Sequence, residues 1–249
     1  ENQKSKELRA GMGEGLVEAG KRNPQVVALS ADVKGSVKMD AFAKEFPDRF
    51  VQCGIAEANM TGIAAGLSLS GKVPFLGGFA EFVTGRTYDQ IRQVVAYSNK
   101  NVKICGSHAG ISLGEDGATH QTMEDIGLMK ALPNMTVLVP CDYNQAKMAT
   151  LTAAEHEGPV YLRLGRSKMP NFTAENEPFT IGKAQMLSEG TDVTLFACGH
   201  LVWEALEAAK ALEAEGISAE VINIHTIKPL DKEAVIASAQ KTGAVVTCE

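Results

Sequence analysis

Short apolar runs alternate with longer helical segments through most of this chain. The apolar runs cover residues 25–30, 50–53, 73–77, 101–105, 136–139 and 160–164, and the helical segments cover 7–20, 39–45, 54–70, 88–98, 123–131 and 143–156. Such runs predict buried strands, and their alternation with helices is typical of a parallel sheet covered on both faces. The sequence therefore predicts an α/β fold.

A second unit of the same kind follows a polar segment. Residues 166–180 are polar and contain two prolines, which indicates a linker. We place this linker at 171–182, between a first domain at 1–170 and a second at 183–249. Strands at 192–198, 219–224 and 244–248, with helices at 201–215 and 232–240, predict a further βαβα unit. Because the chain stops at its last strand, we expect this second domain to be truncated.

Composition excludes several classes of protein. The 249 residues are 45% hydrophobic and 22% charged, as in ordinary globular proteins. A net charge of −6 and a pI near 5.5 argue against nucleic-acid binding, which needs a clustered basic surface. The sequence holds no apolar run of the roughly 20 residues that cross a bilayer, and no N-terminal apolar leader. We therefore expect a soluble, cytoplasmic protein that binds no nucleic acid and no membrane.

The cysteines indicate a reducing compartment. They are widely spaced, odd in number, and form no CxxC pair that would favour zinc or a redox dithiol. Three of them, Cys105, Cys198 and Cys248, lie in strand-like apolar runs. We interpret these three as small buried hydrophobic residues.

A polar loop follows the strand at 101–105. Residues 108–121 read HAGISLGEDGATHQ and bring His108, Asp116 and His120 to the carboxyl end of that strand, where open α/β sheets bind ligands. Two imidazoles and carboxylates suit a hydroxylated substrate, although a surface turn or a metal site could hold the same residues. The loop lacks an HExxH pair, and no GxGxxG fingerprint follows a strand, so neither a metal site nor a dinucleotide site is predicted.

Glu57 is a second candidate for chemistry. It follows the strand at 50–53 and has small apolar neighbours in the sequence GIAEANM. A poorly hydrated carboxyl group there could hold or share a proton near neutral pH. A solvated glutamate that interacts with the positive end of a helix would occupy the same position, and the sequence leaves both interpretations open.

Three phenylalanines form the third feature. Phe75, Phe79 and Phe82 lie in a segment that two adjacent glycines interrupt. Such a cluster could pack in the core or form a slot that stacks on a flat ring. Position alone does not decide between these alternatives.

In this order, these segments resemble the C-terminal half of transketolase, a thiamine diphosphate enzyme. HAGISLGEDGATHQ resembles the most specific signature of the family, and GIAEANMTGIAAGLS resembles the segment with its catalytic glutamate. Phe79, Phe82 and GRTYDQIR resemble the aromatic segment that lines the aminopyrimidine pocket, and LPNMTVLVPCD resembles the next strand and loop. The resemblance implies a pyrimidine-binding domain at 1–170, followed by an incomplete transketolase C-terminal domain.

The resemblance also implies an activity and a partner. The family transfers a two-carbon ketol unit from a ketose phosphate to an aldose phosphate in the pentose phosphate pathway. It also needs an N-terminal domain whose GDG motif holds Mg²⁺ and the cofactor diphosphate, and this sequence contains no GDG motif. The chain thus resembles the C-terminal subunit of a split transketolase, or a fragment of a longer one. We expect an N-terminal transketolase subunit as its partner, with a homodimer of this chain inside a heterotetramer.

The resemblance assigns roles to particular residues. Glu57 would hydrogen-bond N1′ of the aminopyrimidine, while Phe79, Phe82 and Arg86 would line the cofactor site. Asp32 would lie near the cofactor in the neighbouring subunit's site. His108 and His120 would contact donor hydroxyls and assist proton transfers, and Asp116 would orient a hydroxyl. Arg9, Arg166 and Ser36 would bind the sugar phosphate. The resemblance places no metal ligand on this chain.

Three other functions compete with this one. Deoxyxylulose-phosphate synthase shares the glutamate and the DGxTHQ core, but that family tends to have an acidic residue in place of His108. The β subunit of 2-oxoacid dehydrogenases shares the architecture without the EDGATHQ pattern. The chain could also be a catalytically inert structural or regulatory subunit, although it retains Glu57, Asp116 and His120.

Overall fold

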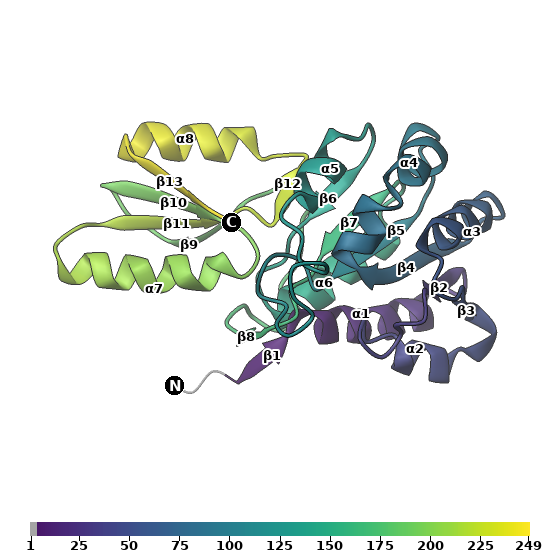
Figure 1. Cartoon of the computed structure of the whole chain (residues 1–249). Coiled ribbons are helices and arrows are strands. Elements are labelled where there is room, and N and C mark those ends of the chain that lie inside the picture. Colours follow the sequence, from purple (N-terminus) through teal and green to yellow (C-terminus); the bar gives the residue numbers. More distant parts are fainter. Residues whose placement is uncertain (1–3) are drawn as a thin grey trace.

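The computed structural model of the chain describes residues 4–249, which form two main sheets side by side (Figure 1). The larger sheet has seven strands in the order β12-β6-β7-β5-β4-β2-β3. Their bounds are β2 (Val26–Ser30), β3 (Phe50–Gln52), β4 (Val73–Phe79), β5 (Lys103–Ser107), β6 (Thr136–Leu138), β7 (Val160–Arg163) and β12 (Thr226–Lys228). All neighbours in this sheet pair in parallel except β12 with β6. The predicted α/β fold with a mainly parallel sheet is confirmed.

Helices cover both faces of the larger sheet (Figure 1). One face carries α1 (Leu8–Arg22), α2 (Asp40–Glu45), η1 (Pro47–Arg49) and α6 (Tyr143–Glu155). The other carries α3 (Glu57–Leu69), η2 (Glu81–Gly85), α4 (Tyr88–Gln90), η3 (Ile91–Tyr97) and α5 (Asp125–Ala131). Successive residues of β2 explain the two layers, since Val26 joins one hydrophobic cluster and Val27 joins the other. A strand buried on both faces reads as a continuous apolar run, which is why the sequence reveals it.

Glycines in α1 serve packing rather than helix termination. The sequence places the end of this helix at Gly20, but α1 continues to Arg22. A Cβ atom on Gly20 would lie 2.7 Å from the rings of Phe42 and Phe46, so the missing side chain makes room for them. A Cβ atom on Gly11 would lie 2.2 Å from the carbonyl oxygen of Tyr143, which starts α6. The glycine-rich sequence thus lets α1 lie against its neighbours on this face.

The segment with the three phenylalanines is one continuous strand up to Phe79. The two glycines at 77 and 78 were expected to interrupt it, but both belong to β4. A Cβ atom on Gly77 would lie 2.5 Å from the Met39 side chain, which explains why glycine is tolerated in a strand there. Phe75 is fully buried in the core, whereas Phe79 at the end of β4 is partly exposed. The strand therefore delivers Phe79 to the carboxyl edge of the sheet.

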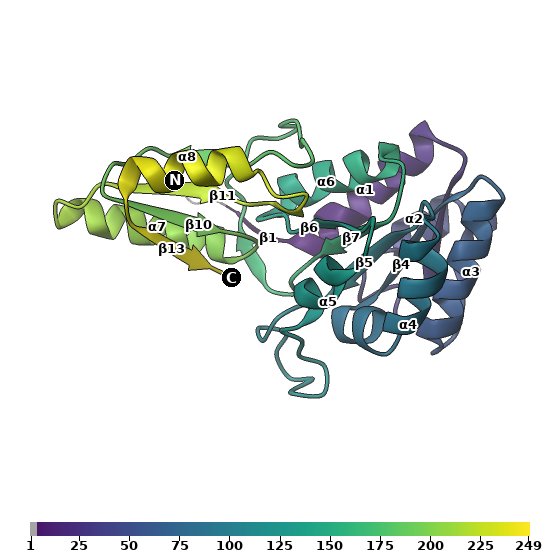
Figure 2. The same cartoon turned by 90° about the horizontal axis from the view of Figure 1, so that it is seen from above.

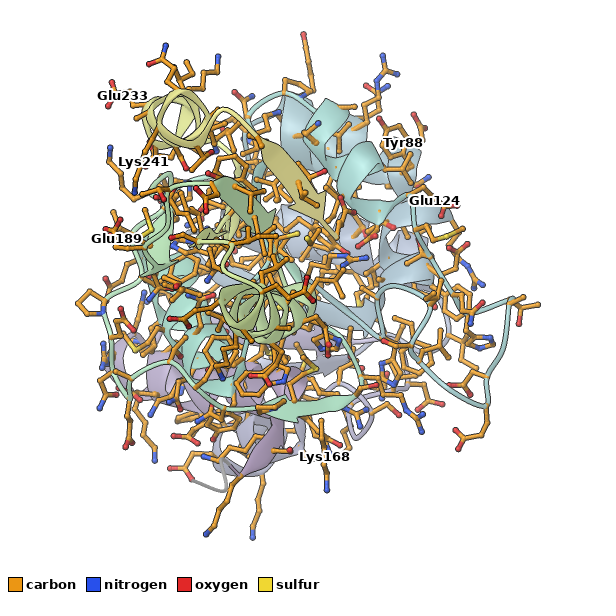
Figure 3. The ribbon with its side chains drawn as sticks, turned by 90° about the vertical axis from the view of Figure 1, so that its left-hand side faces the viewer. Tyr88, Glu124, Lys168, Glu189, Glu233 and Lys241 are labelled. Atoms are coloured by element: carbon orange, nitrogen blue, oxygen red, sulfur yellow. The ribbon has the colours of Figure 1, made fainter. Side chains whose placement is uncertain are left out.

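The smaller sheet belongs to the second half of the chain and has the strand order β13-β10-β11-β9. Its elements are β9 (Gln185–Ser188), β10 (Val193–Ala197), α7 (Leu201–Ala214), β11 (Ala219–Asn223), α8 (Lys232–Thr242) and β13 (Val245–Cys248). The two helices lie on opposite sides of this sheet (Figure 1). Figure 3 views this domain end-on, with Lys241 of α8 close to Glu189, the residue after β9, at a 2.8 Å ion pair.

Short antiparallel strands are the elements that the sequence does not predict. β9 runs antiparallel to β11, and β12 leaves the second half of the chain to pair with β6 of the larger sheet. β1 (Ser5–Glu7) pairs with β8 (Lys168–Pro170), which lies inside the polar segment 166–180. Three- and four-residue strands are too short to show a periodic pattern, so tertiary pairing alone defines them.

The cysteines are free, and most are buried as expected. Burial raises the pKa of the Cys105 and Cys198 thiols to about 12. Cys248 is only half-buried, because its strand β13 is at the edge of the smaller sheet. Among residues 4–249, no helix is long and apolar enough to cross a membrane.

Candidate active site

Candidate residues gather where the parallel strands of the larger sheet end. Asp32 follows β2, Phe79 ends β4, His108 follows β5, and Arg166 lies three residues beyond β7. Glu57 is the first residue of α3, after β3. The loop from His108 to Gln121 projects from the body of the molecule beside α5 (Figure 2). The carboxyl ends of parallel strands thus bring residues from distant parts of the sequence to one edge, the usual place for a ligand.

Glu57 is buried and paired, so the interpretation as a solvated helix-terminal glutamate is wrong. The residue is 6% exposed, and its Oε2 atom lies 3.3 Å from Nη1 of Arg86. The Cζ atom of the same guanidinium lies 4.1 Å from the centre of the Phe82 ring. One planar group therefore touches both the carboxylate and the aromatic face. Arg86 follows η2, a wide π-helical turn of a kind that is frequent at functional sites.

Two phenylalanines and two histidines form an aromatic cluster. The Phe79 and Phe82 rings stack with centroids 6.1 Å apart and an interplanar angle of 27°. The His108 ring is 4.1 Å from Phe79, and the His120 ring is 5.0 Å from Phe82 in an edge-on arrangement. Both phenylalanines are partly exposed, unlike Phe75 in the core. This geometry favours a slot for a flat ring over simple core packing.

His108 is held in a strained and electrostatically defined position. Its backbone has φ 60°, an uncommon value for a residue with a side chain. Burial, together with the charges of Arg9 and Arg166, lowers the pKa of His108 to about 4, so its imidazole is neutral near pH 7. Nη1 of Arg9 lies 3.2 Å from Nε2 and can only donate, so Nε2 accepts and the proton is on Nδ1. Nδ1, 2.8 Å from the Ser107 hydroxyl oxygen, donates to it.

Arg9 joins three distant segments. Besides its contact with His108, Nη1 of Arg9 donates to the carbonyl oxygen of Ser36 at 2.8 Å, and Nη2 pairs with Glu7 at 3.0 Å. Lys38 also pairs with Glu7 at 3.1 Å. Burial acts to raise the pKa of Glu7, but the hydrogen bonds from Arg9 and Lys38 lower it below its ordinary value. Two cations and one carboxylate leave a net positive charge here, as an anionic substrate group requires.

Arg166 covers the base of the projecting loop. Its Nη1 atom donates to the carbonyl oxygen of Leu113 and pairs with Glu115 at 3.2 Å. A Cβ atom on Gly114 would lie 2.4 Å from this guanidinium, and Gly114 has φ +98°, so glycine is required there. Asp116, two residues further along, is exposed on the loop. Arg166 and Asp116 both act on the charge state of His108, Arg166 lowering and Asp116 raising its pKa.

Asp32 and Ser36 lie in the loop after β2, and their present contacts are with other parts of this chain. Asp32 is exposed with φ 61°, and its backbone N–H donates to the Gln52 side chain at 2.8 Å. Its hydrogen-bond partner is therefore a residue of β3 rather than a member of the aromatic cluster. Ser36 contacts Arg9 through its carbonyl oxygen, not through its hydroxyl group.

A buried network that sequence reasoning misses anchors the far end of the loop. Oδ2 of Asp125 accepts from the Tyr161 hydroxyl at 2.6 Å and from Nε of Arg163 at 2.8 Å, and Asp125 is fully buried. This joins the start of α5 to β7. The only signal in the sequence is Arg163 itself, a charged residue inside the apolar run 160–164.

Comparison with known families decides what this arrangement belongs to. The family model described as the transketolase pyrimidine-binding domain matches residues 4–171, and that of the transketolase C-terminal domain matches residues 182–249. The chain belongs to the transketolase family. The resemblance found in the sequence is confirmed. Among residues 4–249, no group of three or more His, Cys, Asp or Glu side chains could hold a metal ion.

Two of the similar proteins are named as a section or a subunit of a transketolase. The chain is 48% identical to a putative transketolase C-terminal section from Methanocaldococcus jannaschii, over 92% of this chain and 73% of that protein. It is 47% identical to the 6-deoxy-6-sulfo-D-fructose transketolase subunit SqwH of a Clostridium species, strain MSTE9, over 94% and 73%. Human transketolase is 38% identical, and the match spans 97% of this chain but 39% of the human protein.

The fold agrees with that of a solved transketolase structure. A protein described as "Split gene transketolase, inactive beta4 tetramer" superposes with a TM-score of 0.91 at 49% identity, covering 98% of this chain and 80% of that one. The chain is therefore a transketolase-family protein similar to the C-terminal subunits of split transketolases.

Proposed function

We propose that this chain is the C-terminal subunit of a thiamine diphosphate-dependent transketolase. With an N-terminal partner subunit, it transfers a two-carbon ketol unit from a ketose phosphate to an aldose phosphate, with sugars of the pentose phosphate pathway as expected substrates. The observation that carries the proposal is the buried Glu57 carboxylate, which shares one planar contact group with the exposed face of Phe82.

The residues present fit the aminopyrimidine end of thiamine diphosphate. The guanidinium of Arg86 shows that a planar group with N–H donors has room between Glu57 and Phe82. A ring in the same place would stack on Phe82 and Phe79 and hydrogen-bond to Glu57. Arg86 is the further residue that we assign to this part of the site, and we assign Asp32 to the cofactor site of the neighbouring subunit. When bound, the cofactor supplies an electron sink for cleaving the bond next to the ketose carbonyl.

Glu57 and the two histidines handle protons in this proposal. Glu57, which is buried, would hydrogen-bond a ring nitrogen of the cofactor. His108 is neutral near pH 7, so it can hydrogen-bond a donor hydroxyl and exchange a proton with it. His120 faces Phe82 and is partly exposed, where it can reach the same sugar. We assign Asp116, which is exposed on the same loop, to orienting a hydroxyl group of the sugar.

Two arginines supply the phosphate site. Nη1 of Arg9 lies 3.2 Å from Nε2 of His108, and Arg166 donates to the carbonyl oxygen of Leu113 in the loop that His108 begins. Their planar forks match a pair of phosphate oxygens, and Ser36 adds a hydroxyl group. Glu115 is the present partner of Arg166 and is 87% exposed in its side chain, so the pair can open at small cost.

Exposed apolar side chains before and at the end of α3, and at the end of η3, support the proposal of a partner subunit. Ile55, Leu69 and Tyr97 are each more than 70% exposed, at 77%, 71% and 77%. Between them, Gly62 and Gly66 of α3 leave open space where a side chain would be. A surface of this kind fits close packing against another subunit. We assign it to the assembly with the N-terminal subunit, which would hold Mg²⁺ and the diphosphate, and with a second copy of this chain.

The test is reconstitution. The purified chain is assayed for ketol transfer with thiamine diphosphate and Mg²⁺, alone and after mixing with an N-terminal transketolase subunit that carries the GDG motif. We expect negligible product from the chain alone and robust product from the mixture. Robust turnover by the chain alone would contradict the split-enzyme proposal, and an inactive mixture would favour the inert-subunit alternative.

A deoxyxylulose-phosphate synthase activity is the second candidate. It shares Glu57 and the DGATHQ core, but the environment of His108 argues against it. A neutral imidazole that accepts from Arg9 suits a donor hydroxyl, whereas an acidic residue there would pair with Arg9 and remove its positive charge. Assaying the reconstituted enzyme with a ketose phosphate and with pyruvate separates the two activities.

A further inference from the structure

The Arg86 guanidinium lies between Glu57 and Phe82, in the slot proposed above for the aminopyrimidine ring. Its guanidinium makes two contacts at once: an ion pair with Oε2 of Glu57 at 3.3 Å and a cation–π contact with Phe82 at 4.1 Å. Its side chain is 49% exposed, whereas that of Glu57 is 7% exposed. The arginine thus lies over the opening to the buried carboxylate. A stack on Phe82 and a hydrogen bond to Glu57 are also the two contacts proposed above for the aminopyrimidine ring.

We propose that Arg86 is a place-holder for the aminopyrimidine ring, which must displace the guanidinium in order to bind. This inference rests on the proposed function, because it concerns the same slot. A flat cation with N–H donors imitates a flat heterocycle with an amino group, and both cannot lie on the same face of Phe82. Arg86 therefore competes with the ring before it contributes anything to the loaded site.

The place-holder also gives the buried Glu57 carboxylate a partner. A buried carboxylate without a partner is costly, and the adjacent guanidinium compensates its charge. When the ring displaces the guanidinium, the ring must take over as the hydrogen-bonding partner of Glu57.

The residues around Arg86 leave space for its side chain when the ring displaces it. Gly85, the residue before Arg86, is exposed and has no side chain. The nearest atom to a Cβ built on Gly85 is Oε1 of Glu81, at 3.5 Å. The half-exposed Arg86 side chain can therefore turn toward solvent without meeting a side chain from residue 85.

The experiment measures ring binding by the full chain without the diphosphate group. Two probes are titrated and followed by NMR: thiamine, and the neutral ring 4-amino-5-hydroxymethyl-2-methylpyrimidine. Arg86→Ala and Arg86→Gln are compared with wild type, and Arg92→Ala is the matched control because it removes an exposed arginine of η3. We expect both Arg86 variants to bind the neutral ring about fivefold more tightly, from loss of the cation–π contact and the ion pair. Arg92→Ala should bind it as wild type does.

Each other outcome has a defined meaning. Equal or weaker ring binding by both Arg86 variants overturns the place-holder, and weaker binding makes Arg86 a direct ligand of the ring. A third outcome is that the Arg86 variants and Arg92→Ala all bind thiamine more tightly, while none binds the neutral ring more tightly. That result would attribute the effect to the overall charge of the protein and would also overturn the place-holder. If neither wild type nor any variant binds either probe, the place-holder is overturned, whereas the proposed function is tested separately by ketol transfer in the reconstituted mixture. Thermal unfolding of each variant verifies that it is folded, and half-exposed Arg86 tolerates at least one of the two substitutions.

Discussion

Buried cationic side chains at the two ends of β5 differ in how completely they are hydrogen-bonded. Lys103 begins the strand and is 1% exposed, and its ammonium group donates to Asn101 Oδ1 at 2.5 Å and to the carbonyl oxygens of His156 at 2.6 Å and Gly158 at 2.7 Å. His108 follows the other end, where its partner Arg9 keeps an Nε atom that is buried without a hydrogen bond. At the amino edge of the sheet, the Lys103 ammonium group has an acceptor in each of three residues. At the carboxyl edge, the buried Nε atom of Arg9 has no acceptor within the described protein.

Because of this difference, we expect residues at the amino edge of the sheet to stabilise the fold and residues at its carboxyl edge to bind ligands. A polar group that finds all its partners inside the protein stabilises the fold and is unavailable to a ligand. At the carboxyl edge, partly exposed Phe79 and Phe82, the displaceable Arg86 and the strained His108 are costs that a bound cofactor and substrate can offset. Substitutions at the two edges should therefore have effects that differ in kind.

The largest expected effect is at Glu57. Glu57→Ala removes the carboxyl group that would hydrogen-bond a ring nitrogen of the cofactor, and we expect turnover of the reconstituted enzyme to fall by about a thousandfold. Folding should persist, because the substitution removes a buried charge rather than a packed apolar group. The measurement is the steady-state rate of ketol transfer beside a thermal unfolding curve. Wild-type turnover in the folded variant would show that the role given to Glu57 is wrong.

Lys103→Met tests the opposite edge. It removes the ammonium group from three acceptors in a buried site, so we expect the free energy of unfolding to fall by about 3 kcal/mol. Urea denaturation measures this loss. Lys72→Met is the matched control, because its ammonium group makes an exposed hydrogen bond to Gln25. Binding of the aminopyrimidine ring by folded Lys103→Met should equal that of wild type, and weakened ring binding would break the separation between the two edges.

The same contrast explains what the sequence predicts and what it does not. Strands such as β2 and β5 are apolar on both faces, so their sequences predict them, and the residues after them point to the site. The pairing of Glu57 with Arg86, and the contact of Arg9 with His108 across 99 positions, depend on tertiary geometry. Lys103 is the reverse case: one lysine inside an apolar run gives no sign that three acceptors surround it. The apolar runs in the sequence predict where the carboxyl edge of the larger sheet lies. The hydrogen-bond partners of the side chains at that edge are known only from the assembled structure.

A smaller effect is expected at Arg166. If it binds the sugar phosphate, Arg166→Ala loses charge-assisted hydrogen bonds, and KM for fructose 6-phosphate should rise about thirtyfold. Unphosphorylated fructose, the control donor, should show little change. Initial-rate kinetics of the reconstituted enzyme distinguish the two. Equal losses for both donors would mean that Arg166 only stabilises the loop around Leu113 and Glu115, to which it is bonded here.

The smallest expected effect is on the pH dependence of stability, and it compares His225 with His108. Burial lowers the pKa of His225 from its ordinary 6.5 to about 4, and that of His108 to about 4 with added repulsion from Arg9 and Arg166. Between these values the unfolded chain binds more protons than the folded one, so stability falls as the pH drops from 6.5 toward 4. His225 packs on Phe179, with ring centroids 4.1 Å apart, and lies outside the proposed site.

His225→Gln should therefore remove about 1 kcal/mol of the stability lost over the first pH unit below 6.5, as measured by urea denaturation at several pH values. His108→Gln should reduce the acid sensitivity in the same direction. Only His108→Gln should also impair ketol transfer, because only that imidazole faces the proposed sugar. An undiminished acid sensitivity in His225→Gln would show that its imidazole is not held neutral by burial. A comparable loss of activity in both variants would show that the chemistry is not confined to the carboxyl edge of the larger sheet.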